Sequence, residues 1–242
     1  IKSRGLGDVY KRQMQIQTVK VQRLYQQVAD QLIGLIRAGT PAPGQRLPSE
    51  RDLAEQFGVS RPTIREAMIA LEIAGVVEIR SGSGVYVANA GSAGAFPALD
   101  QGAGPFEILE ARRIVECEAA ALAAERINDA QLAALEAQLV AMQRENLQEN
   151  MTERADERFH CLIAQAAGNG VIAALVGWLW QLRNDSVIST HFHQRVRKEG
   201  SRPIIEDHRR ILQALQEGAS ATARTVMAEH LQRVVDTLMA EE

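Results

Sequence analysis

Four polar side chains in the second half of the chain have the types and spacing of a metal site. Asp156 and His160 lie four residues apart, so one helix would present both on the same face. His208 and His230 lie in two later segments with helical periodicity. One carboxylate and three imidazoles from three helices suit a divalent ion and leave room for water or a ligand oxygen. The same four residues would also fit a buried hydrogen-bond cluster without a metal.

A second group of residues suits contacts to DNA. Arg61 and Arg65 lie one helical turn apart, with Thr63 between them. A guanidinium group can donate to guanine O6 and N7 in the major groove, and hydroxyl and amide groups at a helix start can hold phosphates. Taken singly, each arginine would equally suit a solvated helix face or an ion pair with a nearby glutamate.

The segments around these arginines predict a helix-turn-helix followed by a hairpin. Helical periodicity begins at Val21, and two further helices follow the capping residues Ser49 and Ser60. Two short apolar runs on either side of the glycine-containing stretch 81–84 predict strands. Residues 14–88 are therefore expected to form three helices with a β-hairpin wing.

The remainder of the chain predicts a linker and a second, all-α domain. Residues 89–104 are rich in glycine and alanine and predict a flexible linker. Residues 105–242 predict an antiparallel helical bundle, so the fold class is mainly α. Residues 1–13 resemble a translated sequencing adapter and are excluded as a non-native tail. The expected bundle helices are 106–126, 129–149, 152–167, 171–197, 203–217 and 220–240.

Composition and charge are those of a globular protein and argue against a membrane protein or a disulfide-rich one. The chain has 46% hydrophobic and 24% charged residues, which is ordinary for a globular protein. It has neither a bilayer-length apolar run nor a signal-peptide pattern, so we expect a cytoplasmic protein without membrane contacts. Two cysteines outside any C-x-x-C pair exclude a disulfide framework. Residues 14–88 hold eight basic and seven acidic residues, against fifteen and twenty-one in 105–242, so the first domain better suits a polyanion.

Residues 47–87 resemble the winged helix-turn-helix of the GntR family of bacterial transcription regulators. The motifs are LPSERDLA at 47–54, GVSRPTIREA at 58–67 and RSGSGVYV at 80–87. The resemblance implies double-stranded, palindromic operator DNA as the partner. It also implies DNA contacts from Arg51, Ser60, Arg61, Thr63, Arg65, Ser81 and Gly82.

Residues 105–240 resemble the ligand-binding FCD domain of the FadR subfamily. The motifs are DERFH at 156–160, AGN at 167–169, DHRRILQAL at 207–215 and HL at 230–231. In that domain an aspartate and three histidines at these positions hold a metal, and a carboxylate effector completes its shell. The resemblance therefore implies zinc, or alternatively nickel or manganese, on Asp156, His160, His208 and His230.

Two arginines are candidate effector ligands by the same resemblance. Arg112 occupies the position of an inward-facing arginine that can pair with a carboxylate, although a surface ion pair with Glu116 fits equally well. The WLWQLR stretch at 178–183 most resembles the hexuronate-responsive Uxu and Exu repressors. By this resemblance Trp180 could stack on a sugar acid and Arg183 could bind its carboxylate, but core packing of both tryptophans is the favoured interpretation.

Together these features predict a homodimeric transcription regulator, expected to be a repressor and not an enzyme. A hexuronate such as fructuronate would bind the metal-containing pocket and release the operator. One alternative is a regulator that responds to a different organic acid. Another is a metal-dependent hydrolase, which the lack of an H-E-x-x-H element and of a carboxylate placed as general base disfavours.

Overall fold

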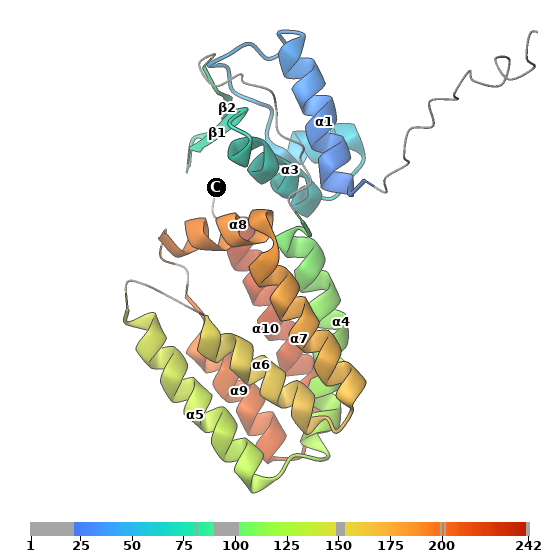
Figure 1. Ribbon diagram of the computed structural model, residues 1–242, viewed down its shortest axis with the longest axis vertical. Helices are drawn as coiled ribbons and strands as arrows, with labels where there is room; N and C mark the ends of the chain where they lie inside the picture. Colours follow the sequence, from blue (N-terminus) through green and yellow to red (C-terminus); the bar gives the residue numbers. More distant parts are fainter. Residues whose placement is uncertain are drawn as a thin grey trace, which may run out of the picture.

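The computed structural model describes residues 22–80, 82–89, 102–148, 153–198, 200 and 202–240. These residues form ten helices and two strands, arranged as a small N-terminal unit on one end of an elongated helical bundle (Figure 1). The mainly α fold class is confirmed. Within the described ranges, no helix combines the length and the apolar character needed to cross a lipid bilayer.

The N-terminal unit, called the winged unit below, contains three helices and a hairpin, as the sequence predicts. The strands β1 and β2 are antiparallel, with Val77 opposite Val87 and Arg80 opposite Gly84. Its elements are α1 (Leu24–Arg37), α2 (Glu50–Phe57), α3 (Arg61–Ile73), β1 (Val77–Arg80) and β2 (Gly84–Val87).

Local capping explains where α2 and α3 begin and end. The Ser49 hydroxyl accepts a hydrogen bond from the Asp52 amide at 3.2 Å, and the Ser60 hydroxyl accepts one from the Thr63 amide at 3.3 Å. Gly58 ends α2 with a φ of 65°, a conformation that glycine adopts without strain. These caps set the tight turn between α2 and α3. Helix α3 packs on α1, and the core between them contains the buried side chains of Val28, Leu32, Ile64, Met68 and Leu71.

The bundle consists of seven helices, and its two longest members, α4 and α10, lie side by side. Helix α6 packs between α4, α5 and α7, while α9 packs against α5 and α10. The helices are α4 (Pro105–Ala124), α5 (Asp129–Asn146), α6 (Arg154–Ala166), α7 (Gly170–Asp185), α8 (Val187–Lys198), α9 (Ile205–Gln216) and α10 (Ser220–Ala240).

The prediction of a single helix over 171–197 is wrong, because the helix is interrupted at Ser186. The Ser186 side chain is buried, donates to the Ala103 carbonyl at 2.6 Å and accepts from the Ser189 amide at 3.3 Å. It therefore ends α7 and starts α8, which turns across the end of the bundle towards α3 (Figure 1). The break depends on a partner 83 residues away, so helical periodicity alone could not reveal it.

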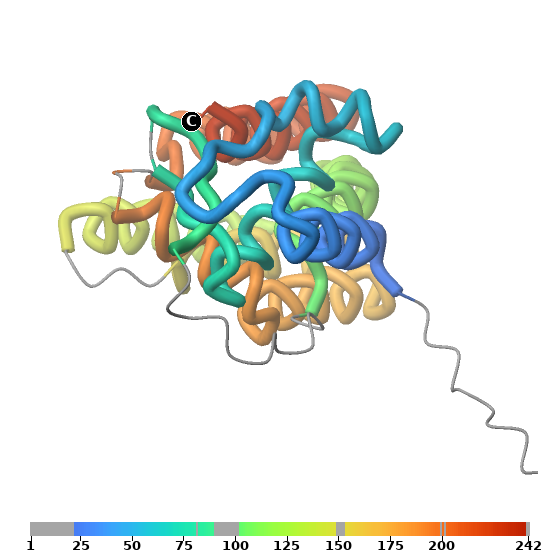
Figure 2. The backbone as a smooth tube through the Cα atoms, turned by 90° about the horizontal axis from the view of Figure 1, so that it is seen from above, coloured from blue at the N-terminus to red at the C-terminus, as the bar shows by residue number. Residues whose placement is uncertain are grey.

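The winged unit rests on the end of the bundle, with α3 against α4 and α8. Seen from above in Figure 2, it lies over that end. Residues 102–104, the last part of the expected linker, are packed here, since the Tyr25 hydroxyl donates to the Gly102 carbonyl at 2.8 Å and Ala103 is buried. Positions 90–101 of the expected linker and the tail 1–13 lie outside the described residues.

The two tryptophans should differ sharply in their effect on stability. Trp180 is 0% exposed, whereas Trp178 is 55% exposed. We expect Trp180→Ala to lower the free energy of unfolding by about 3–5 kcal/mol, because it leaves a large cavity. Trp178→Ala should change it by no more than about 0.5 kcal/mol. Urea denaturation followed by circular dichroism measures both, and equal effects would contradict the packing described.

Candidate metal centre and nucleic-acid interface

The structure brings the four predicted metal ligands together inside the bundle. Asp156 and His160 come from α6, His208 from α9 and His230 from α10. One ligand atom from each side chain lies within 4.8 Å of the others. The three histidines are buried, so the cluster is shielded from bulk water.

Partners outside the cluster orient two of the imidazoles. His208 Nδ1 lies 2.9 Å from the Ile204 carbonyl oxygen. His160 Nδ1 lies 2.5 Å from Glu116 Oε2 on α4. A histidine whose Nδ1 is held by an oxygen presents Nε2 to a metal, which is the usual outer-shell arrangement of metal-binding histidines.

The third histidine has a carboxylate neighbour that the sequence analysis did not single out. His230 Nδ1 lies 3.5 Å from Asp207 Oδ2, and Asp207 is in turn paired with Arg233 at 2.6 Å. Asp207 directly precedes His208, so the EDH sequence at 206–208 was the available signal. Glu116 was also missed in this role, because it was considered only as a partner of Arg112.

The inward-facing atoms fit a cation. His208 Nε2 lies 2.7 Å from Asp156 Oδ1, whereas His160 Nε2 lies 3.7 Å from the same oxygen. Within the described part of the chain, buried His160 Nε2 has no hydrogen-bond partner. A purely hydrogen-bonded cluster would leave that nitrogen unsatisfied, whereas a divalent ion of the zinc type takes three imidazole nitrogens and one carboxylate oxygen.

Electrostatics keep His230 and Asp156 in the forms that can bind a metal. Burial is the main cause that lowers the pKa of His230 to about 4; the nearby His208 and His160 act in the same direction, while Asp207 and Asp156 oppose the shift. Burial alone would raise the pKa of Asp156, but the hydrogen bond and charge of His208 hold it well below its usual range. Burial opposes the protonation of His208, yet its hydrogen bond to Asp156 raises its pKa. A neutral His230 and an ionised Asp156 are the forms that coordinate metals.

A small cavity opens beside the cluster. Its volume is about 70 Å³, well below the ~300–1,000 Å³ of most ligand pockets, so a ligand of sugar size needs some side chains to move. Four arginines and two carboxylates are among the residues that line this cavity. The lining includes Asp156 and His230 together with Arg112, Arg183, His193 and Arg197.

Arg112 reaches the cavity but is also part of a buried ion pair. Its Nε donates to Glu116 Oε1 at 2.6 Å, and its guanidinium carbon lies 3.9 Å from the centroid of Trp180. The pair expected at the surface is therefore present but buried, a correction that follows from α4 packing inside the bundle. Burial would raise the pKa of Glu116, but Arg112 and His160 lower it to about 2.

Arg183 also lines the cavity and shares an anionic partner with Arg197. Glu153 forms ion pairs with both arginines, and Arg183 Nε donates to His193 Nε2 at 3.3 Å. Burial, together with the positive charges of Arg112 and Arg197, lowers the pKa of Arg183 to about 9. Glu153 and Arg197 were not identified from the sequence, because helical periodicity does not show which charges face one cavity.

The expected core packing is found for one of the two tryptophans, Trp180. Its fully buried indole is covered by Arg112 and packs against the ring of His160, with centroids 5.6 Å apart. The core-packing interpretation therefore holds for Trp180. It does not hold for Trp178, whose side chain is exposed.

In the winged unit, Arg51 and Arg61 point into solvent, with side chains 84% and 45% exposed. Ser60 and Thr63 lie at the start of α3, where their hydroxyls are 2.8 Å apart. Gly82 is exposed at the tip of the wing and has a φ of 68°. These are suitable positions for phosphate or base contacts. Ser81 lies outside the described residues.

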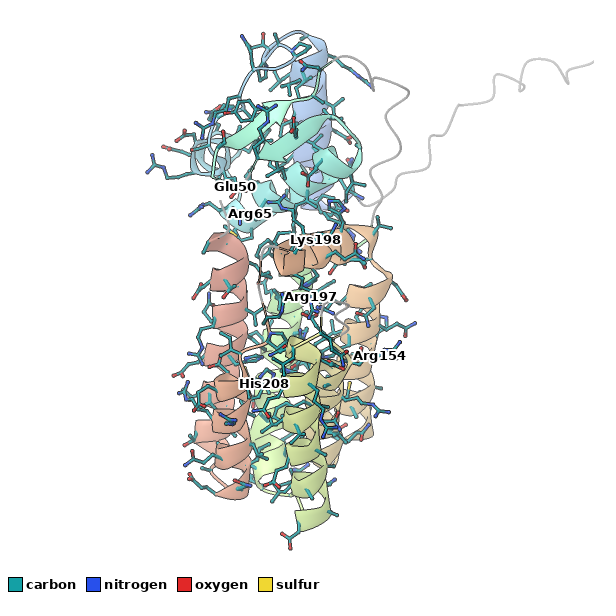
Figure 3. The ribbon with its side chains drawn as sticks, turned by 90° about the vertical axis from the view of Figure 1, so that its left-hand side faces the viewer. Glu50, Arg65, Arg154, Arg197, Lys198 and His208 are labelled. Carbon is teal, nitrogen blue, oxygen red and sulfur yellow. The ribbon has the colours of Figure 1, made fainter. Side chains whose placement is uncertain are left out.

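Arg65 does not project from the winged unit as the sequence analysis expects. Its side chain is 7% exposed, and its Nε donates to Glu50 Oε1 at 2.9 Å. Its Nη1 donates to the Leu238 carbonyl oxygen of α10 at 2.6 Å, and Figure 3 shows Arg65 above the end of that helix. The correction arises because α3 packs against the bundle, a contact between domains that local spacing cannot reveal.

Comparison with known families divides the chain into two parts. Residues 24–87 match the family described as bacterial regulatory proteins, gntR family. Residues 107–233 match the FCD domain. The two matches cover the winged unit and most of the helical bundle.

Relatives of similar length match most of the chain. The Uxu operon regulator of Haemophilus influenzae is 36% identical over 217 residues, which cover 88% of this chain and 81% of the relative. The Uxu operon transcriptional regulator of Escherichia coli is 35% identical over 229 residues, covering 90% and 88%. The Exu regulon transcriptional regulator of Escherichia coli is 32% identical over 230 residues, covering 90% and 86%. A solved GntR structure from Streptococcus agalactiae is 28% identical, covers 87% of this chain and 98% of its own, and gives a TM-score of 0.42.

The buried, neutral state of His230 should make stability depend on pH. An unfolded histidine takes up a proton below about pH 6.5, whereas folded His230 stays neutral until about pH 4. Acidification from pH 7 to pH 4.5 therefore lowers the free energy of unfolding through this residue, by at most about 3 kcal/mol. We expect the Tm of the metal-free protein, measured in EDTA, to fall more steeply with acid than that of His230→Gln. Parallel curves for the two proteins would show that His230 is protonated as readily in the folded state as in the unfolded state.

Proposed function

Because the chain belongs to the GntR family of bacterial transcription regulators, with an FCD domain after its winged helix-turn-helix, we propose that it controls hexuronate genes in response to a small carboxylate. The proposal is supported by the relatives of the chain and by the residues around the His3Asp cluster. Relatives that match about 90% of the chain are Uxu and Exu regulators, and the His3Asp cluster faces a cavity lined by arginines. Such a site suits an anion with oxygen donors.

The resident metal of the proposal is a divalent ion held by Asp156, His160, His208 and His230. Zinc is the first candidate because it favours three imidazoles with one carboxylate, and nickel and manganese are the alternatives. When bound, the ion would supply a Lewis-acidic position for a ligand oxygen. Three observations support this assignment: the orphaned His160 Nε2, the hydrogen bond of His208 Nδ1 to the Ile204 carbonyl, and the carboxylates of Glu116 and Asp207 near the other two imidazoles.

The effector of the proposal is a hexuronate such as fructuronate, with its carboxylate recognised at this site. Arg112 and Arg183 lie on the cavity wall and would neutralise the charge of the ligand. Both arginines already have carboxylate partners, Glu116 and Glu153, which hold them in place. A different organic acid is the alternative effector.

The DNA partner of the proposal is a palindromic, double-stranded operator bound by a homodimer. A twofold dimer presents two recognition helices to two half-sites. Arg51, Ser60, Arg61, Thr63 and the wing residues Ser81 and Gly82 would make the contacts. Effector binding would lower operator affinity and so relieve repression, with a coupling free energy of ~1–3 kcal/mol. A hydrolase is not proposed, because the family and the matching relatives are regulators.

Loss of Arg61 should weaken specific DNA binding. If the Arg61 guanidinium contacts a guanine, we expect Arg61→Ala to weaken the free energy of specific DNA binding by about 1–3 kcal/mol and to relax the base preference at that position. Fluorescence anisotropy with a duplex that the wild-type protein selects from a random library measures the change. Arg209→Ala, which removes an exposed arginine of α9, is the matched control. Equal affinities for all three proteins would refute the assigned contact.

Loss of His208 should remove both metal and effector response. We expect His208→Ala to lose stoichiometric metal in elemental analysis, because one of four ligands and a buried contact to Asp156 disappear. The variant should still bind DNA but no longer release it on addition of hexuronate. His191→Ala, which lies outside the cluster, should keep the metal content of the wild type.

Two outcomes would overturn separate parts of this assignment. Wild-type metal affinity in His208→Ala would show that the ligand set is wrong. If fructuronate, tagaturonate, glucuronate and galacturonate all leave the Tm and the DNA affinity of the metal-loaded protein unchanged, the hexuronate assignment fails. The screen would then move to other small acids, which raise the Tm by mass action when they bind.

A further inference from the structure

Two neighbouring residues of α3 hold the winged unit against the ends of two bundle helices. Arg65 contacts the C-terminal end of α10, and Glu66 contacts the N-terminal end of α4. Both side chains are buried. Because α3 is the helix expected to enter the major groove, this contact occupies part of the surface that would read DNA.

The Glu66 carboxylate caps α4. Its Oε1 accepts hydrogen bonds from the Phe106 amide at 3.0 Å and from the Glu107 amide at 3.2 Å. Amides in the first turn of a helix have no acceptor within the helix. Burial raises the pKa of Glu66 to about 7, while the two amide hydrogen bonds oppose this shift. The approach is so close that a Cβ at Gly104 would lie 2.2 Å from Glu66 Cδ.

The Arg65 guanidinium is held by two oxygen acceptors. The Leu238 carbonyl oxygen accepts from Nη1, and Glu50 accepts from Nε (Figure 3). A cation at the C-terminal end of a helix is favoured by the helix dipole. Guanine offers a guanidinium two acceptors in the same way, through O6 and N7. The end of α10 therefore satisfies the donors that Arg65 would otherwise present to a base.

We propose that this contact is an autoinhibitory latch, in which the ends of α4 and α10 form a docking surface for the recognition helix α3. Operator DNA then binds only after Arg65 leaves the Leu238 carbonyl and Glu66 leaves the α4 amides. The inference rests on the proposed function, since it requires that α3 reads DNA.

Other contacts between the two parts are peripheral to the latch. Arg23 pairs with Glu107 at 2.6 Å, and Glu72 pairs with Arg195 at 3.3 Å. Clefts of about 460 Å³ and about 310 Å³ are lined by residues of both parts. The interface is apolar as well as polar, because one buried hydrophobic cluster includes Tyr25 and Ile69 of the winged unit and Phe106 and Phe192 of the bundle.

The latch is joined to the effector site through the same two helices. Helix α4 carries Arg112 and Glu116, and α10 carries His230. Effector binding that favours the present packing of α4 against α10 would keep the docking surface formed. A ligand shifts such an equilibrium only by its difference in affinity for the two states. This gives the cavity a direct mechanical route to the recognition helix.

A reversible disulfide tests the latch. In the double variant Glu66→Cys, Gly104→Cys, the two Cβ atoms are at most about 5 Å apart, because a Cβ at 104 would touch Glu66 Cδ, which is two bonds from the Cβ of residue 66. A disulfide joins Cβ atoms about 3.5–4.5 Å apart, so a small shift of either side chain suffices. Gly104 has a φ of −68°, which cysteine adopts without strain. Oxidation should reduce affinity for the selected duplex by about tenfold or more, and dithiothreitol should restore it. Each single-cysteine variant serves as a control.

Three outcomes of this experiment would contradict either the latch or the proposed DNA binding. Oxidised protein that binds the duplex as tightly as its reduced form would overturn the latch. A folded double variant that forms no 66–104 disulfide would overturn it too, since the two positions would not be adjacent. If wild-type protein selects and binds no duplex, the proposed DNA-binding function fails independently of the latch.

A second pair of variants avoids new covalent bonds. Glu66→Ala removes the cap on α4, whereas Glu66→Gln keeps an oxygen that can accept from both amides. We expect the alanine variant to bind the duplex about fivefold more tightly or better, and the glutamine variant to resemble wild type. Weaker or unchanged binding by Glu66→Ala in protein with a wild-type circular dichroism spectrum would contradict the latch.

Discussion

The arrangement of the candidate site depends on one buried carboxylate, that of Glu116, which needs positively charged or hydrogen-bonding partners. It sits in the bundle core between the Arg112 guanidinium and the His160 ring. An unpaired carboxylate there would be very costly, so all three groups must keep their positions. One consequence is that His160 presents Nε2 to Asp156, His208 and His230. The other is that Arg112 is held at the cavity wall against Trp180.

The sequence predicted the features that depend on local signals. Ser49, Gly58 and Ser60 mark the ends of α2 and α3 because capping and positive φ are properties of single residues and their neighbours. The convergence of Asp156 with three histidines followed from helical spacing combined with a resemblance that covers the bundle. Both kinds of signal are visible without a structure.

What the sequence could not show depends on contacts between distant segments. The break at Ser186 requires the Ala103 carbonyl, and the burial of Arg65 requires the end of α10. The charge network is similar, since Glu153 joins Arg183 to Arg197 only when α6, α7 and α8 meet. Helical periodicity shows which face of a helix such residues occupy, but it does not show which other helix packs against that face.

The small volume of the cavity affects how fast the protein can respond. At about 70 Å³, it does not admit a ligand of sugar size until some lining side chains move. Association is then limited by how often the protein opens rather than by how often the ligand arrives, and gated association of this kind falls below the usual ~10⁵–10⁷ M⁻¹s⁻¹. Brief fluctuations in metabolite concentration are thereby averaged out, and only a sustained change alters the bound fraction.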